Sequence, residues 1–282
     1  MSAILHPPEG GFGERRPRKS WGQHFLMDDN IQRKIIKAAE VIPGEQIVEI
    51  GPGRGILTEG LLAKGASVIA IEIDPVYVAA LSQRLLSRYP NALQLVHANA
   101  LRYRYDALLG AYKIVANLPY YLSTPLLFGL MAHRQAIPLM VLMLQREFAD
   151  RLCASVGQSS YGALSVIVQR HADIHTLFPV SRTCFRPQPR VDSSVVRIVP
   201  LSIPRVSVTD ESCFLRTVKA AFGYRRKSLA NALVNGGFPK QQVLSALSHL
   251  QIDLLLRGET LSLSEFAQLS DVLHSVGVSL GT

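Results

Sequence analysis

The residues best suited to chemistry form the tetrapeptide Asn117-Leu118-Pro119-Tyr120, which directly follows a short apolar segment. The exocyclic amine of an adenine is a poor nucleophile because its lone pair is delocalised into the ring. Two acceptors, the Asn117 side-chain oxygen and the Leu118 carbonyl, could draw that nitrogen toward a pyramidal shape. Pro119 stiffens the turn, and the Tyr120 ring could stack on the base. We interpret the tetrapeptide as a site for methylating an adenine amine; a strand-end turn with a core tyrosine is the alternative.

Two further segments carry candidate substrate contacts. Phe185 lies in a loop with prolines at alternate positions, where it could close the other face of an extruded adenine; a core phenylalanine is the alternative. Arg225, Arg226 and Lys227 form a basic cluster at the start of a predicted helix. Such a cluster suits phosphate contact, although a solvated helix end would have the same composition.

A glycine-rich turn forms the second chemical feature. An apolar run at residues 47–50 leads into Gly51, Gly53 and Gly55, and helical spacing then resumes. Glycine is needed where the backbone takes positive φ or where a ligand lies against it. The pattern predicts a buried strand, a tight turn and a helix start.

The surrounding residues limit the classes of ligand that this turn could bind. Glu72 ends the next apolar run, about 20 residues on, a spacing at which an acid can accept hydrogen bonds from ribose hydroxyls. The dinucleotide fingerprint and the Walker lysine are both absent. The pattern E-x-G-x-G-x-G, headed by Glu49, resembles the first motif of S-adenosylmethionine-dependent methyltransferases with a Rossmann-like fold. An ordinary glycine turn is the alternative.

Alternating strands and helices are expected to position these residues. Strands are predicted at residues 47–50, 68–72, 93–96, 113–116 and 139–144, and helices at residues 31–41, 56–63, 76–89, 125–133 and 146–153. The alternation predicts an α/β fold with a mostly parallel sheet and helices on both faces. Residues 174–180 and 194–200 are predicted to pair as a terminal hairpin. Four residues follow strand ends and should converge on one crevice: Gly51, Glu72, Asn99 and Asn117.

Helical periodicity dominates the C-terminal part, at residues 213–222, 228–234, 240–250 and 264–274. We therefore expect a disordered basic tail at residues 1–20, a methyltransferase domain at residues 21–204 and a small all-helical, RNA-contacting domain at residues 205–282.

Composition favours a polyanionic partner. The 282-residue chain is 48% hydrophobic and has a formal net charge of +9, which favours a polyanionic partner such as a nucleic acid. Its apolar runs are too short to span a membrane. Three scattered cysteines, Cys153, Cys184 and Cys213, fit no metal spacing and favour a reducing cytoplasm.

Six motifs occur in one order and together carry a family resemblance. They are G-Q-H-F-L (22–26), E-I-G-P-G-x-G (49–55), E-x-D (72–74), N-L-P-Y (117–120), F-x-P-x-P-x-V-D-S (185–193) and R-R-K-S-L-x-N (225–231). The chain resembles the bacterial small-subunit ribosomal RNA adenine dimethyltransferases from about residue 20 to its end. The resemblance implies a cytoplasmic, monomeric 16S rRNA (adenine-N6)-dimethyltransferase that uses S-adenosylmethionine to dimethylate two adjacent adenosines in the small ribosomal subunit or its precursor.

The resemblance also implies the cofactor contacts, which fall on His24, Leu26, Gly51, Gly53, Glu72, Asn99 and Asn117. Two of them depart from the usual pattern: the family commonly has Asn in place of His24 and Asp in place of Asn99. An asparagine oxygen can still accept from the cofactor's adenine amine, but without charge, so we expect a weaker contact.

Three rival functions remain open at this stage. A large-subunit methyltransferase of the erythromycin-resistance type shares the first four motifs, but the Arg225–Asn231 segment weighs against it. A ribosome-assembly factor without catalysis would not need the intact Asn117–Tyr120 turn. A DNA adenine methyltransferase would share the amine chemistry, but no separate DNA-reading domain is apparent in the sequence.

Overall fold

The computed structural model describes residues 24–224 and 226–280. The predicted basic tail (residues 1–20) and Arg225 lie outside the described residues. The described part divides into two compact units. One comprises residues up to 149 together with residues 175–200, and the other comprises residues 150–174 and 201 onward.

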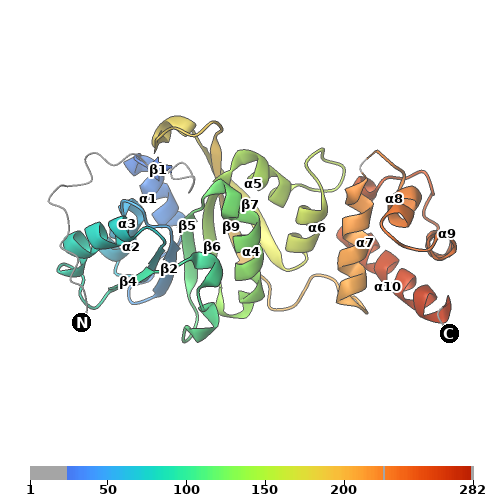
Figure 1. Cartoon of the computed structure of the whole chain (residues 1–282), viewed down its shortest axis with the longest axis horizontal. Helices are drawn as coiled ribbons and strands as arrows, with labels where there is room; N and C mark the ends of the chain where they lie inside the picture. The colour runs from blue at the N-terminus through green and yellow to red at the C-terminus, as the bar shows by residue number, and fades with distance from the viewer. Residues whose placement is uncertain (1–23, 225, 281–282) are drawn as a thin grey trace. The chain divides into compact units, whose positions relative to one another are not determined.

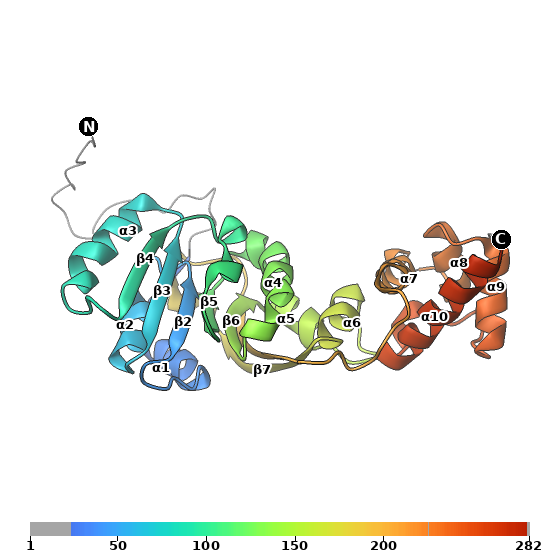
Figure 2. The same cartoon turned by 90° about the horizontal axis from the view of Figure 1, so that it is seen from below.

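The first unit is built on a seven-stranded sheet in the order β4-β3-β2-β5-β6-β9-β7. Figure 2 shows β4, β3, β2, β5 and β6 in that succession. Strands β2 to β6 are parallel, and β9 runs antiparallel to β6. The bounds are β2 Gln46–Ile50, β3 Ser67–Glu72, β4 Leu93–His97, β5 Lys113–Asn117, β6 Met140–Gln145, β7 Ala172–Val180 and β9 Ser193–Pro200. The predicted α/β fold is confirmed, and the five predicted parallel strands match to within one residue at each end.

The strand order reverses between β2 and β5. From β2 the chain moves outward to β3 and β4 and then returns to the other side of β2 as β5. Open parallel sheets bind ligands at such a switch point, beyond the carboxyl ends of the strands. Gly51 follows β2 and Asn117 ends β5, so the two chemical motifs flank this point.

Apolar side chains cover both faces of the sheet. Ile47, Val68 and Val115 pack into one core cluster with helices α1 and α2, whereas the alternate residues Val48 and Ile69 are buried on the opposite face. Alternating side chains that are buried on both faces are expected of a sheet between helix layers. Figure 1 shows helices of this unit around the strands. They are α1 Asp29–Ala38, α2 Ile56–Ala63, α3 Pro75–Leu81, which continues as a π-helical turn Ser82–Leu86, α4 Ser123–Ala132 and α5 Arg146–Cys153.

A separate two-stranded pairing brings distant segments together. Strand β1 (Phe25–Leu26) pairs antiparallel with β8 (Phe185–Arg186). Next to it, the Asp28 carboxylate accepts hydrogen bonds from the backbone N–H groups of Asn30 and Ile31, which caps the N-terminus of α1. Phe25 and Leu26 of the G-Q-H-F-L motif are thereby paired with the proline-rich segment.

The second unit is all-helical. Its helices are α6 Ala163–Gln169, α7 Glu211–Gly223, α8 Leu229–Asn235, α9 Lys240–His249 and α10 Leu263–Leu280. They share a core of aromatic and aliphatic side chains that includes Phe214, Phe238 and Phe266. The predicted all-helical part is therefore present.

The division between the units differs from the boundary expected near residue 204. Residues 150–174 group with the helical unit, because Tyr161 and Val166 pack into its core. The Tyr161 hydroxyl also donates to the carbonyl of Leu261 over 3.0 Å. Helix α6 was not predicted from the sequence. Its apolar face is buried by helices that follow about 50 residues later in the chain.

Candidate active site

The turn after β2 is built from glycines with positive φ. Gly51 and Gly53 have φ values of 69° and 52°, a region that residues with side chains rarely adopt. A Cβ at Gly53 would lie 2.8 Å from the Phe25 ring, whereas a Cβ at Gly51 would meet no heavy atom within 4 Å. The backbone at Gly51 is therefore open, and Gly51 lines a pocket.

A buried carboxylate ties this turn to β3. One oxygen of Glu72 accepts from Gly53 N–H over 3.1 Å and the other from Asp74 N–H over 2.9 Å. Burial raises the pKa of Glu72, while these two hydrogen bonds oppose the rise. A carboxyl oxygen can accept more than one hydrogen bond, so Glu72 could also accept from the hydroxyls of a ribose. The open backbone and this carboxylate fit the adenosine part of S-adenosylmethionine.

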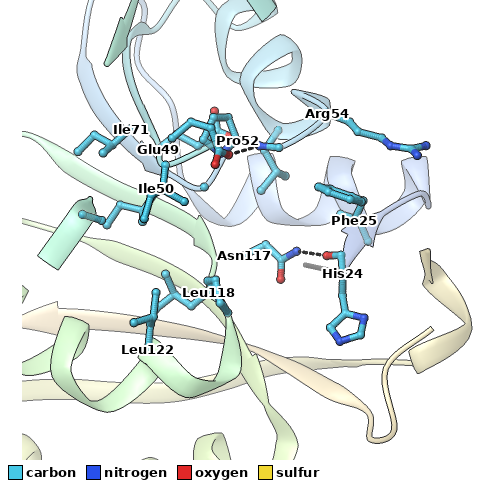
Figure 3. A pocket seen from close by; sticks show the side chains of 18 of the residues that line it. His24, Phe25, Glu49, Ile50, Pro52, Arg54, Ile71, Asn117, Leu118 and Leu122 are labelled. Carbon is cyan, nitrogen blue, oxygen red and sulfur yellow. Dashed lines mark hydrogen bonds between the residues drawn. The ribbon is translucent and has the colours of Figure 1, made fainter. Parts of the chain in front are cut away.

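Glu49 is a second buried acid in the same pocket. Glu49 is 1% exposed and lines the pocket beside Ile50 and Pro52 (Figure 3). Desolvation raises the pKa of Glu49 to about 8, so the carboxyl is protonated at neutral pH. From the sequence, Glu49 is recognised only as the head of the glycine motif; its place as an acid inside an apolar strand was the available signal for its burial.

The end of β5 presents an amide whose orientation is fixed. The Asn117 Nδ2 donates to the backbone carbonyl of His24 over 3.0 Å (Figure 3). A carbonyl can only accept, so the amide nitrogen must face His24. The Asn117 Oδ1 is thereby directed away from His24 as an acceptor.

The following residues anchor the turn. Leu118 is buried, and its N–H donates to the carbonyl of Met143 in β6 over 3.1 Å. Pro119 and Tyr120 line the same pocket as Asn117. The structure thus brings all four residues of the predicted Asn-Leu-Pro-Tyr site to the pocket that Gly51 and Glu72 line.

Tyr120 is held in place at both its hydroxyl and its ring. The hydroxyl lies 2.9 Å from the Ser193 Oγ, and the ring stacks with the His24 imidazole at a centroid distance of 5.9 Å. Sequence reasoning missed Ser193, although this serine ends the F-x-P-x-P-x-V-D-S motif, which was the available signal.

The remaining predicted cofactor residues also line this pocket. Leu26 is buried and packs into the core cluster beneath it. The Asn99 Oδ1 accepts from Leu101 N–H over 2.9 Å, which turns the chain after β4. The pocket is therefore lined by every residue predicted to contact the cofactor: His24, Leu26, Gly51, Gly53, Glu72, Asn99 and Asn117.

Phe185 is a correction to the predicted site. Its side chain is 1% exposed, belongs to the core cluster and is absent from the pocket lining. Pairing of β8 with β1 turns it toward the core, where its apolar area is removed from water. The alternative noted from the sequence, a core phenylalanine, describes this residue.

Of the predicted RNA-binding residues, Arg226 and Lys227 belong to the helical unit and do not line the pocket, and Arg225 lies outside the described residues. Arg226 and Lys227 are exposed just before α8. Among the described residues, no cluster of His, Cys, Asp or Glu is placed to hold a metal ion. No helix within the described ranges is long and apolar enough to cross a membrane.

Comparison with known proteins gives a consistent assignment. The family model described as "Ribosomal RNA adenine dimethylase" matches residues 14–275. The "Ribosomal RNA small subunit methyltransferase A" of Moorella thermoacetica is 47% identical over 269 residues, covering 92% of this chain and 93% of the relative. The protein of the same name from Geobacter metallireducens is 42% identical, covering 93% of this chain and 97% of the relative.

Solved structures agree with the fold. A dimethyladenosine transferase from Plasmodium falciparum is 30% identical, with a TM-score of 0.76, and covers 87% of this chain and 96% of its own. The 23S rRNA methyltransferase ErmE shares the fold at 24% identity, with a TM-score of 0.70 over 89% of this chain and 99% of its own. The chain belongs to the ribosomal RNA adenine dimethylase family of S-adenosylmethionine-dependent methyltransferases.

Proposed function

We propose that this protein transfers methyl groups from S-adenosylmethionine to the N6 amines of two adjacent adenosines in 16S rRNA of the small ribosomal subunit. The relatives at 42–47% identity bear the name of a small-subunit methyltransferase. The last two of the six ordered motifs, at residues 185–193 and 225–231, support the same substrate.

The orientation of Asn117 is the observation that carries the proposal. Because its Nδ2 donates to the His24 carbonyl, its Oδ1 is presented to the pocket as an acceptor. An adenine N6 amine has two N–H donors, so it complements an acceptor at this position.

The residues of the chain would each contribute to the reaction. When bound, S-adenosylmethionine supplies an electrophilic methyl group. The Asn117 Oδ1 and the Leu118 carbonyl accept the two hydrogens of the N6 amine and localise its lone pair on nitrogen. Tyr120 stacks on the extruded base, and Glu72 holds the ribose of the cofactor. The amine proton can leave to solvent after methyl transfer, so a strong general base would not be required.

The test uses small ribosomal subunits that lack these methyl groups. The protein and S-adenosylmethionine are incubated with them, and the nucleosides are then analysed by mass spectrometry. We expect N6,N6-dimethyladenosine in the small-subunit RNA and none in a parallel sample of large subunits. Methylation of large subunits alone would favour the resistance type, and binding without any methyl transfer would favour a non-catalytic assembly factor.

The basic cluster Arg225, Arg226 and Lys227 is proposed to contact the phosphates of the RNA. Replacing all three by Ala should weaken RNA binding and reduce its log–log salt slope by about one unit for each lost contact. Cofactor affinity should stay unchanged, because Arg226 and Lys227 do not line the pocket. An unchanged salt slope would make the cluster a solvated helix end.

A further inference from the structure

An arginine from the segment after β3 holds the glycine turn by its backbone. The Arg84 Nη2 donates to the carbonyl of Arg54 over 2.6 Å. Arg54 stands between Gly53 and Gly55 in the turn and lines the pocket. The helical hydrogen bonds of α2 begin with Glu59 N–H donating to the Gly55 carbonyl. The Arg54 carbonyl therefore lies just outside the helix, where a side-chain donor satisfies it.

The same nitrogen joins the turn to helix α2. The Arg84 Nη2 lies 2.7 Å from the Glu59 Oε1. A guanidinium Nη carries two hydrogens, so one can bind the Arg54 carbonyl and the other the Glu59 carboxylate. The two side chains are 35% and 42% exposed, and an ion pair this exposed contributes little to stability by itself. Its effect is to fix the guanidinium beside the Arg54 carbonyl.

The absence of a side chain at Gly55 makes room for this guanidinium. A Cβ at Gly55 would lie 2.7 Å from the Arg84 Nη2 and would also overlap the Leu81 side chain. Gly55 has a φ of 81°, a region that residues with side chains rarely adopt. Glycine at this position thus serves both the backbone conformation and the close approach of Arg84.

Arg84 lies in an irregular part of its helix. It belongs to the π-helical turn Ser82–Leu86 that continues α3. Such turns are rare, occur mostly singly within α-helices and are frequent at functional sites. On either side of Arg84, Leu81 and Leu85 are buried in the core cluster together with Leu61 of α2. These two leucines anchor the segment against the element that follows the glycine turn.

We propose that Arg84 is a positioning residue for cofactor binding, which keeps the glycine turn in the conformation that receives S-adenosylmethionine by holding the Arg54 carbonyl. The Glu72 carboxylate holds the same turn at the Gly53 N–H over 3.1 Å. A carboxylate thus binds a donor of the turn, and a guanidinium binds an acceptor. Arg84 does not line the pocket, so it acts through the backbone. The inference depends on the cofactor and not on which RNA is methylated.

The experiment compares Arg84→Met and Arg84→Lys with Arg88→Met as a matched control. Arg88 lies four residues further on, is exposed and has its guanidinium over the Tyr89 ring. Its loss removes the same charge from the same segment without altering the glycine turn. Calorimetry without RNA gives the affinity for S-adenosylmethionine, and steady-state methylation gives kcat and the KM for the cofactor. Thermal unfolding shows whether each variant is folded.

We expect Arg84→Met to weaken the affinity for the cofactor and to raise its KM on the order of tenfold, with little change in kcat at saturating cofactor. Arg84→Lys keeps a cationic donor and should restore most of the affinity, and Arg88→Met should match the wild type. Glu59→Gln should have a smaller effect that disappears in the Arg84→Met background, because Glu59 acts only through Arg84.

Three results would overturn the inference. Arg84→Met could lower thermal stability while the affinity for the cofactor stays at the wild-type value, which would make the contact merely structural. It could lower kcat without changing the KM for the cofactor. Arg88→Met could weaken binding as much as Arg84→Met, which would make the effect one of general charge. A wild-type protein that binds the cofactor but methylates no small subunits would refute the proposed function and leave this inference standing.

Discussion

The two sides of the pocket are held by contacts of different range. On the cofactor side, residues 51–55 are tied to Glu72 by a hydrogen bond that spans 19 residues, and Glu72 also binds Asp74, two residues on. On the base side, the hydrogen bonds of Asn117, Tyr120 and His24 span 93, 73 and 163 residues. The glycine turn and Glu72 are therefore joined within one strand–turn–helix–strand unit, whereas the base side exists only after distant segments have folded together.

The cofactor side and the base side should also respond differently to the loss of a side chain. Glu72 is 5% exposed and satisfies two backbone N–H groups, so it supports both the turn and the ligand. Asn117 makes one side-chain bond to a carbonyl and, under the proposed function, directs its Oδ1 to the substrate. Substitutions on the cofactor side should thus alter cofactor affinity and stability together, and those on the base side should chiefly lower the rate of methyl transfer.

The largest effect is expected for Asn117→Ala. Loss of one positioned acceptor should reduce the methyl-transfer rate on the order of a hundredfold or more, by analogy with removing an oxyanion-hole donor. RNA binding should survive, because it depends on phosphate contacts spread over a basic surface. Single-turnover kinetics with saturating cofactor measure the chemical step.

Tyr120 supplies matched controls for that experiment. Tyr120→Ala should slow turnover by removing the stack, whereas Tyr120→Phe keeps the ring, loses only the bond to Ser193 and should retain most activity. If Asn117→Ala transfers methyl groups at nearly the wild-type rate, the turn is structural and the base side is assigned incorrectly.

Glu72→Ala should show the opposite pattern. Cofactor affinity should fall on the order of tenfold, because the ribose loses a charged acceptor. Thermal stability should fall as well, because the Gly53 and Asp74 N–H groups lose their acceptor at about 1–3 kcal/mol each. Calorimetry and thermal unfolding test the two effects, with Glu72→Gln, which keeps one acceptor oxygen, as the control. Unchanged affinity would separate Glu72 from cofactor binding.

The raised pKa of Glu49 predicts that the free energy of unfolding depends on pH. Its folded-state pKa of about 8 lies above the ordinary value of 4.5, so between these values the folded protein holds a proton that the unfolded chain has released. The contribution of Glu49 to the stability of the folded protein is complete below pH 4.5 and is lost as pH rises through 8. The free energy of unfolding should fall by at most about 1.4 kcal/mol per pH unit over this range. Glu49→Gln should lack this component when denaturant unfolding is measured from pH 5 to 8. Parallel curves for the two proteins would contradict a protonated Glu49.

The smallest effect is expected for Asn99→Asp. A charged acceptor makes a stronger bond to the cofactor's adenine amine, so affinity should equal or exceed that of the wild type by no more than about 1 kcal/mol. Aspartate can also accept from Leu101 N–H as Asn99 does, which preserves the turn. Clearly weaker binding by calorimetry would mean that Asn99 faces something other than that amine.

Much of the fold could be predicted because its signals are local. Strand β2, the glycine turn and helix α2 follow from an apolar run, residues that tolerate positive φ and helical spacing within 18 residues. Helix α6 could not be predicted in the same way, because Tyr161 and Val166 are buried by helices of the later sequence.

The sequence by itself determined the α/β class, the glycine turn with Glu72 at the end of the next strand, and the Asn-Leu-Pro-Tyr turn after β5. These features depend on residue types at fixed short spacings, which constrain the backbone directly. Only the tertiary structure decided that residues 150–174 join the helical unit, that Phe185 faces the core and that the Asn117 amide points its nitrogen at His24. Each of these depends on which distant segment packs against the residue or provides its hydrogen-bond partner. The spacing of residues along the chain does not indicate which segment that is.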